Sequence, residues 1–192
     1  MSDGLIDIHS HVLPGVDDGS RDTDESLELL RGLSGAGFRH VFCTPHHGWG
    51  QHRNTPSNVP PRVKKLQAAV DEAGLDVTLH AGGEHAIFDD LSDQRPRDWS
   101  TPAGYFLLDF WQPRRPKFIE PAIRRLQSFG LKPIFAHPER YTWVQDDPDA
   151  SARWFASLDV ELQLNVYTLA GGHPDAEPVA RRWLDEGRYT YA

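Results

Sequence analysis

Residues 5–11, Leu5-Ile6-Asp7-Ile8-His9-Ser10-His11, combine a short apolar run with two histidines at its end. The apolar and β-branched residues predict a strand over residues 5–9. Side chains two residues apart on a strand point to the same side, so His9 and His11 can converge on one ion. Two imidazoles with nearby carboxylates form a mixed nitrogen and oxygen site, which suits Mn, Fe, Zn or Mg. Taken alone, the pair also fits two histidines that hydrogen-bond to backbone at a strand end.

The rest of the chain alternates short β-like runs with helix-like stretches. Strands are predicted at residues 5–9, 40–44, 77–81, 105–110, 132–136, 160–166 and 188–191. Helices are predicted at residues 22–36, 59–73, 118–129, 150–157 and 176–186. This alternation is typical of βαβ units with a parallel sheet. Seven predicted strands that follow one another without a break in the series favour a barrel-like α/β fold over an open sheet. We expect residues 1–192 to form a single domain.

Nearly every predicted strand ends in a possible metal ligand. In α/β barrels the C-terminal strand ends share one face, where active sites gather. The side chains at these ends are His9 with His11, His46 with His47, Glu84 with His85, Asp109, and His137. We therefore expect imidazoles and carboxylates from these ends to converge in one pocket.

Several of these residues also have a plainer interpretation. His46 and His47 follow a proline and fit a polar loop, while Glu84 fits a solvated carboxylate in a first helical turn. Asp109 is harder to explain in this way. It lies within the apolar residues 106–110, where an unpaired buried carboxylate would be costly. The coincidence of all these residues at strand ends is stronger than any one of them.

A turn, Val16-Asp17-Asp18-Gly19, follows His11 closely. It fits an ordinary Asp-Gly turn that leads into a helix N-cap. It equally fits a further metal ligand, supplied by Asp17 or by Asp18.

The composition excludes several classes of protein. With 39% hydrophobic and 25% charged residues, the chain is ordinary for a soluble globular protein. No apolar run approaches the roughly 18 residues of a membrane span. A net charge of −8, without a block of Lys or Arg, argues against a nucleic-acid partner. A single cysteine, Cys43, rules out an internal disulfide and leads us to expect a cytoplasmic protein.

Together these motifs resemble the polymerase-and-histidinol-phosphatase (PHP) superfamily, and more narrowly the bacterial capsular-polysaccharide tyrosine phosphatases of the CpsB/YwqE type. The resemblance covers nearly the whole chain, in order and spacing. It rests on residues 6–11, 16–19, Thr44-Pro45-His46, Gly82-Gly83-Glu84, Leu108-Asp109-Phe110, residues 136–141 and Leu162-Gln163-Leu164-Asn165. It implies a distorted (β/α)7 barrel with two or three divalent ions, commonly manganese. It also implies removal of phosphate from tyrosines, typically on the tail of a tyrosine kinase that controls exopolysaccharide synthesis or export.

The resemblance also implies a role for individual residues. Three ions would be held by His9, His11 and Glu84; by Glu84, Asp109 and His137; and by Asp18 and His46. Asp109 stands where the family usually has glutamate, and its shorter arm would shift the second ion. Arg140 would grip a phosphate oxygen, because a guanidinium fork suits phosphate geometry. The alternative for Arg140 is a salt bridge with Glu139 or another neighbouring acid.

The resemblance further implies an Asp-x-His motif after the last strand. The printed sequence ends at Tyr189-Thr190-Tyr191-Ala192, where that motif would begin, so we expect a barrel that is incomplete at its C-terminus. For these 192 residues we expect two well-occupied ions, a weak or empty third position, and reduced or absent activity.

The expected reaction is hydrolysis of a phosphomonoester. A water activated by the ions would attack phosphorus in line, while the ions and Arg140 neutralise the developing charge. Cys43 is not expected to act as a nucleophile, because no Gly/Arg phosphate cradle follows it. Two alternatives stay open: a PHP-type phosphatase of small molecules, and a catalytically impaired metal-binding regulatory module.

Overall fold

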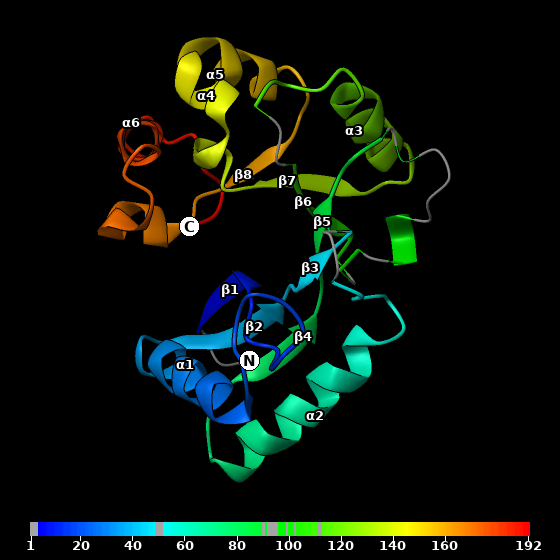
Figure 1. The fold of residues 1–192 in the computed structure, drawn as a ribbon, viewed down its shortest axis with the longest axis vertical. Coiled ribbons are helices and arrows are strands. Elements are labelled where there is room, and N and C mark those ends of the chain that lie inside the picture. Colours follow the sequence, from blue (N-terminus) through cyan, green and yellow to red (C-terminus); the bar gives the residue numbers. More distant parts are fainter. Residues whose placement is uncertain are drawn as a thin grey trace. The chain divides into compact units, whose positions relative to one another are not determined.

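A computed structural model describes residues 4–48, 52–89, 91, 96–98, 100–101, 103–110 and 113–192. The chain forms two compact units, Met1–His85 and Ala86–Ala192, each with its own hydrophobic core. The two units are described separately below (Figure 1). The single domain expected over residues 1–192 stays a prediction.

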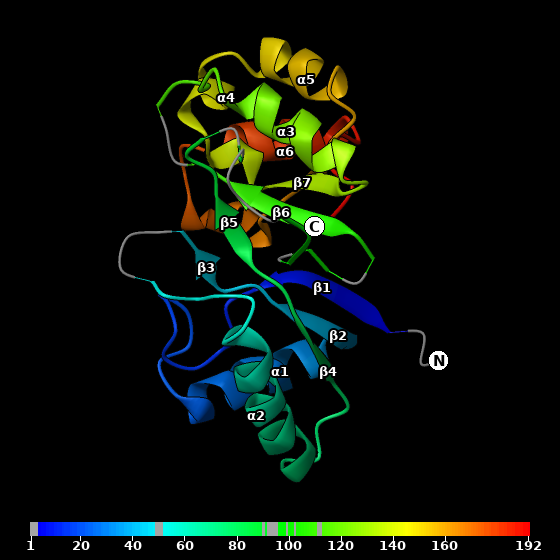
Figure 2. The same ribbon diagram turned by 90° about the vertical axis from the view of Figure 1, so that its right-hand side faces the viewer.

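The first unit is a parallel sheet with two helices on one face. Its strands, in the spatial order β1-β2-β4, are β1 (Leu5–Ser10), β2 (Phe38–Cys43) and β4 (Thr78–Ala81). The connecting helices are α1 (Thr23–Gly35) and α2 (Val59–Glu72), which lie on the same side of the sheet (Figure 2). A second parallel pair joins β3 (His46–His47) to β5 (Glu84–Ala86). Within each of these parallel pairs, the C-terminal ends of the two strands therefore lie at the same edge.

Local sequence explains why these elements form. The Asp22 side chain accepts a hydrogen bond from Glu25 N and caps α1, and the start of α2 carries prolines in its first turn. On β2, Val41 and Cys43 are buried against the helices, as the alternation of a strand requires. Leu30 and Val70 fill the space beneath them.

The second unit repeats the same plan. Its parallel strands, in the order β6-β7-β8, are β6 (Tyr105–Asp109), β7 (Lys132–Ala136) and β8 (Glu161–Gln163). Its helices are α3 (Ile119–Ser128), α4 (Thr142–Asp146), α5 (Pro148–Ala156) and α6 (Glu177–Asp185), and its short helical turns are η1 (Pro96–Asp98), η2 (Pro138–Arg140) and η3 (Thr168–Gly172). Leu126, Phe135, Phe155 and Trp183 form the centre of its core. Because β6, β7 and β8 are parallel, their C-terminal ends lie at one edge of the sheet.

The structure confirms an α/β fold with parallel sheets, and most predicted elements are found within two or three residues of their expected bounds. The closed barrel is not confirmed, because the β1-β2-β4 sheet and the β6-β7-β8 strands are open within their units. The prediction of a strand over residues 188–191 was wrong. Only an isolated bridge between Gln163 and Tyr191 forms there, flanked by a hydrogen bond from Thr190 N to Leu162 O.

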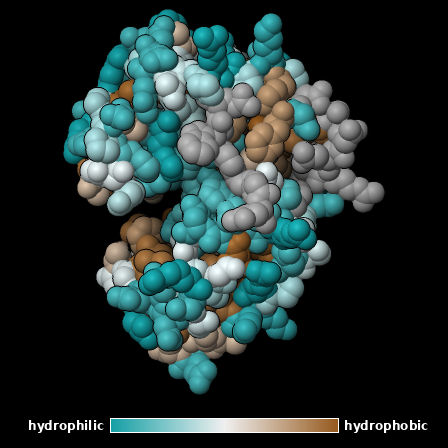
Figure 3. Space-filling view, viewed as in Figure 1, coloured by the Kyte–Doolittle hydropathy of each residue, from teal (hydrophilic) through white to brown (hydrophobic). Residues whose placement is uncertain are grey.

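Hydrophilic side chains cover most of the face shown in Figure 3, with a hydrophobic patch over β1 of the first unit, where Leu5 and Ile6 are exposed. In the described part of the chain, no helix has the length and apolar character that a membrane crossing requires.

Candidate metal centre

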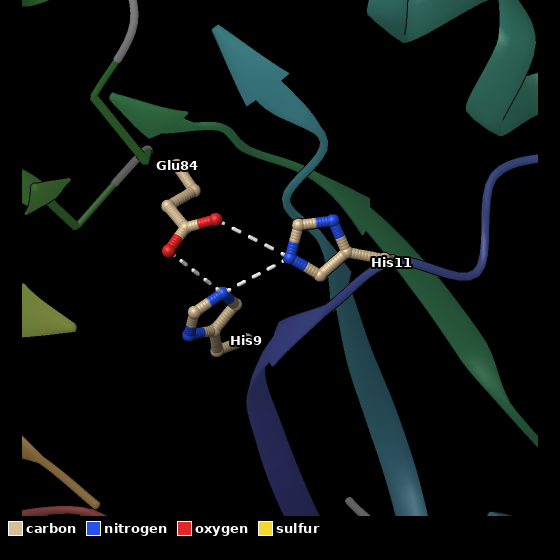
Figure 4. Close-up of side chains that lie close together, drawn as sticks. All are labelled: His9, His11 and Glu84. Atoms are coloured by element: carbon tan, nitrogen blue, oxygen red, sulfur yellow. Dashed lines mark hydrogen bonds and ion pairs between the residues drawn. The ribbon is translucent and has the colours of Figure 1, made fainter. Parts of the chain in front are cut away.

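His9 and His11 point to the same side of the chain at the end of β1, as the strand periodicity predicted. Their Nε2 atoms lie 3.2 Å apart. The carboxylate of Glu84 faces both rings, with Oε1 3.5 Å from His9 Nε2 and Oε2 3.3 Å from His11 Nε2 (Figure 4). Two imidazoles and one carboxylate thus direct their donor atoms toward one point, and these atoms lie within 4.8 Å of one another.

Backbone pairing brings these side chains together from distant parts of the first unit. Ser10 N donates to Thr44 Oγ1, and Thr44 N donates to Ser10 O, which joins the ends of β1 and β2. Glu84 N donates to Pro45 O, which brings the start of β5 beside the segment after β2. The parallel pairing of β3 with β5 then places His46 beside the Glu84 carboxylate.

Asp17 holds His11 in place. Its side chain is fully buried, and Oδ2 lies 2.8 Å from His11 Nδ1. A carboxylate only accepts, so Nδ1 donates to Asp17, and Nε2, which faces Glu84, is the atom that a metal ion would bind in place of a proton. The same carboxylate accepts from His46 N and Gly19 N.

The turn that carries Asp17 fits closely against His11. A Cβ at Gly19 would lie 2.1 Å from His11 O, so only glycine is accommodated at that position. Ser20 N donates to His11 O and closes the turn.

Asp18 and His46 extend the cluster toward solvent. His46 Nε2 lies 3.3 Å from Asp18 Oδ1, and His46 Nδ1 lies 2.8 Å from Glu84 Oε2. His11, Asp18 and His46 form a second group with ligand atoms within 4.8 Å of one another. The structure thus separates the two neighbouring acids, with Asp17 buried behind His11 and Asp18 largely exposed beside His46.

The electrostatics of this cluster favour positive charge. Burial opposes ionisation of His11, but hydrogen bonds to Asp17 and Glu84 outweigh it and raise the pKa of His11 to about 10. The pKa of Asp17 is lowered, because its hydrogen bond to His11 and backbone N–H donors outweigh the effect of burial. Three carboxylates face three imidazoles, so a divalent cation would supply the positive charge that the surroundings favour. The residues present therefore fit a divalent metal ion.

The second unit places two further predicted ligands together. Asp109 ends β6 and His137 follows β7, both are buried, and their ligand atoms lie within 4.8 Å of each other. Asp109 Oδ1 accepts from Phe110 N. His137 has a left-handed backbone with φ 34°, an uncommon conformation for a residue other than glycine that is often found at functional sites. That all seven predicted ligands share one pocket stays a prediction.

Arg140 ends the helical turn η2, three residues after His137, and its side chain is exposed. The expected alternative is a salt bridge to Glu139 or to another neighbouring acid. However, the Glu139 carboxylate is fully buried and accepts hydrogen bonds from Asn165 N, Thr168 Oγ1 and Tyr189 Oη. Among the described residues, no hydrogen bond or ion pair is made by the Arg140 guanidinium, so the charge is available to a ligand.

Cys43 has the properties of a structural residue. It is fully buried on β2, and burial with the nearby charge of Asp7 raises its pKa to about 12. A protonated thiol without solvent access is a poor nucleophile.

Comparison with known proteins supports the same family as the motifs. The model of the family described as "Capsular polysaccharide synthesis, CpsB/CapC" matches residues 5–184. The tyrosine-protein phosphatase YwqE of Bacillus subtilis (strain 168) is 30% identical over 147 residues, which are 75% of this chain and 58% of YwqE. The putative tyrosine-protein phosphatase CapC of Staphylococcus aureus is 29% identical over 139 residues, 71% of this chain and 54% of CapC. The chain thus spans little more than half the length of these relatives.

A solved structure is similar over almost the whole chain. It belongs to the work described as "Crystal structures of YwqE from Bacillus subtilis and CpsB from Streptococcus pneumoniae, unique metal-dependent tyrosine phosphatases". The TM-score is 0.89 at 26% sequence identity, and the match covers 98% of this chain and 78% of the other. With a family match over residues 5–184, the chain belongs to the CpsB/CapC family of capsular polysaccharide synthesis.

Proposed function

We propose that this protein hydrolyses phosphomonoesters in a metal-dependent reaction, with phosphotyrosine on a bacterial protein as its substrate. The observation that carries the proposal is the cluster of His9, His11 and Glu84, in which Asp17 orients one of the imidazoles. The names of the relatives, which are tyrosine phosphatases, supply the substrate class. The partner we propose is a tyrosine kinase of polysaccharide synthesis or export, and the reducing cytoplasm is the proposed location.

Each predicted site residue has a proposed role. His9, His11 and Glu84 would hold one ion. Asp18 and His46 would hold another, to which His11 can also contribute. Asp109 and His137 would be ligands from the second unit. Two or three ions would be bound, with manganese the first choice because the donors mix imidazole nitrogen and carboxylate oxygen. Such ions lower the pKa of water and neutralise phosphate oxygens.

The protein's own side chains supply the rest of the chemistry. Asp17 keeps the proton of His11 on Nδ1, so that Nε2 stays available as a ligand. Arg140 offers an exposed guanidinium that can donate two hydrogen bonds to phosphate oxygens. The phenol of phosphotyrosine, with a pKa of about 10, is a better leaving group than an alkanol and makes a mild demand on a general acid.

Phosphate release from purified protein tests the proposal. With Mn²⁺ present, we expect faster release from a phosphotyrosine peptide than from alkyl phosphate esters. Equal or faster release from alkyl esters would favour the small-molecule phosphatase instead. Tight Mn²⁺ binding without turnover of any ester would favour the regulatory module.

The role of Asp17 gives a separate prediction about metal affinity. Asp17→Asn removes the negative charge behind His11, and loss of such a partner weakens metal binding by about 10-fold. Calorimetric titration of the protein with Mn²⁺ measures the change in metal affinity. Asp24→Asn, at an exposed position in the first turn of α1, is the matched control and should bind as the parent does. An unchanged affinity in Asp17→Asn would show that Asp17 only supports the turn.

A further inference from the structure

An exposed aromatic residue stands close to the end of β8 in the second unit. Tyr167 is 63% exposed and Val166 is 58% exposed, which is unusual for large apolar side chains. They come after the end of β8, as Asp109 forms the end of β6 and as His137 and Arg140 come after the end of β7. Because these three strands are parallel neighbours, all these residues lie at the same edge of the sheet.

Hydrogen bonds to the buried Glu139 carboxylate hold the residues on both sides of Tyr167. Glu139 Oε1 accepts from Asn165 N at 3.1 Å and from Thr168 Oγ1 at 3.2 Å. Tyr167 N donates to Asn165 Oδ1, and Thr168 is fully buried. Residues 165–168 are therefore held in a defined position beside Glu139, the residue that precedes Arg140, although Tyr167 itself is exposed.

The ring of Tyr167 packs against the neighbouring residues Gly172 and His173. A Cβ at Gly172 would lie 2.1 Å from the ring carbon Cε1 of Tyr167, so the ring lies directly on the glycine backbone. The imidazole of His173 meets the ring edge-on, with centroids 5.8 Å apart. One face of an aromatic ring is thereby supported by protein, while much of the side chain stays open to solvent.

His173 connects this ring to the charged residues after β7. The pKa of His173 is lowered, first by burial and then by the charges of Arg140 and His137. The hydrogen bond from Asn165 N to Glu139 Oε1 independently joins the segment that carries Tyr167 to the turn that carries Arg140. An exposed cation and a seated aromatic ring at one sheet edge match a ligand that carries an anion on an aryl group.

We propose that Tyr167, seated on Gly172 and flanked by Val166, is the surface against which the aryl ring of a phosphotyrosine side chain packs while Arg140 contacts its phosphate. This inference rests on the proposed function and adds the residue that selects aryl over alkyl esters. Aromatic pairs add attraction beyond area burial, and a ring that is already seated needs little further ordering. Loss of the ring should therefore weaken aryl binding by about 5- to 20-fold.

Binding measurements test the inference without relying on turnover. The probes are a peptide with a non-hydrolysable phosphonate in place of the phosphotyrosine phosphate, and inorganic phosphate, both titrated calorimetrically into Mn²⁺-loaded protein. Tyr167→Ala should weaken peptide binding by about 5- to 20-fold and leave phosphate binding unchanged. Tyr167→Phe, which keeps the ring, should retain peptide binding. Leu184→Ala, another exposed apolar position of the second unit, should bind both probes as the parent does.

The outcomes separate the inference from the proposed function. Parent-like peptide binding by Tyr167→Ala, or an equal loss of both probes, would overturn the inference while the proposed function stands. A parent protein that releases no phosphate from a phosphotyrosine peptide and binds neither probe would overturn both.

Discussion

Removal of divalent ions with excess chelator is expected to abolish hydrolysis of an aryl phosphate, and added Mn²⁺ should restore activity better than Ca²⁺. The cluster in the first unit offers the imidazoles of His9, His11 and His46, and Ca²⁺ prefers oxygen ligands alone. Metal ions supply several kcal/mol of transition-state stabilisation, so the loss should exceed about 10³-fold in rate.

Metal content measured beside activity makes this experiment decisive. We expect the ions and the activity to fall together during dialysis against chelator, and both to return with Mn²⁺. The buried charges of Asp17 and Glu84 should also make the metal-free protein melt at a lower temperature, because ion binding stabilises the folded state. Full activity in excess chelator would contradict the proposed chemistry. A covalent nucleophile would then be required, and Cys43 is too deeply buried to serve.

The residues that the sequence could identify are those whose geometry follows from a single element. His9 and His11 are two residues apart on a strand, so their common direction follows from the pleat alone. Asp109 was conspicuous because it interrupts an apolar run, and the structure shows it buried at the end of β6. Strand ends in parallel α/β units share an edge, which is why Asp109 and His137 could be expected near each other.

Residues that depend on a turn or on distant partners could not be assigned in this way. Asp17 and Asp18 are adjacent acids, and only the path of the turn past His11 decides which one is buried. Glu139 bonds to residues 26 to 50 positions away, so its neighbour Arg140 could not be separated from it by sequence. The packing of the Tyr167 ring depends on its close approach to Gly172. The only sign of this in the sequence is the glycine pair Gly171-Gly172.

Short elements were missed because they carry too few residues for a periodic pattern. The strands β3 and β5 have two and three residues, and the helix α4 has five. Their positions are set by pairing and packing instead. The pairing of β3 with β5 brings His46 beside Glu84, so part of the candidate metal site depends on elements too short for the sequence to predict.

Arg140→Ala is expected to lower the aryl-phosphatase efficiency, kcat/KM, by about 10²-fold, which is the usual effect of losing one charge-stabilising contact. The guanidinium lies three residues after His137 and is exposed, so its removal should leave the fold and the metal content unchanged. Steady-state kinetics on an aryl phosphate, with metal content determined on the same sample, measures both quantities.

Two further variants show whether the guanidinium itself matters. Arg140→Lys keeps the charge but loses the planar fork that binds two phosphate oxygens, so it should recover only part of the efficiency. Arg124→Ala removes an exposed arginine that pairs with Glu120 on α3, and it should retain parent efficiency. Parent-like kinetics in Arg140→Ala would show that the phosphate is held by the ions alone. A fall of equal size in metal content would instead place Arg140 among the groups that support the metal ligands, since His137 and Arg140 share the turn closed by the hydrogen bond from Arg140 N to His137 O.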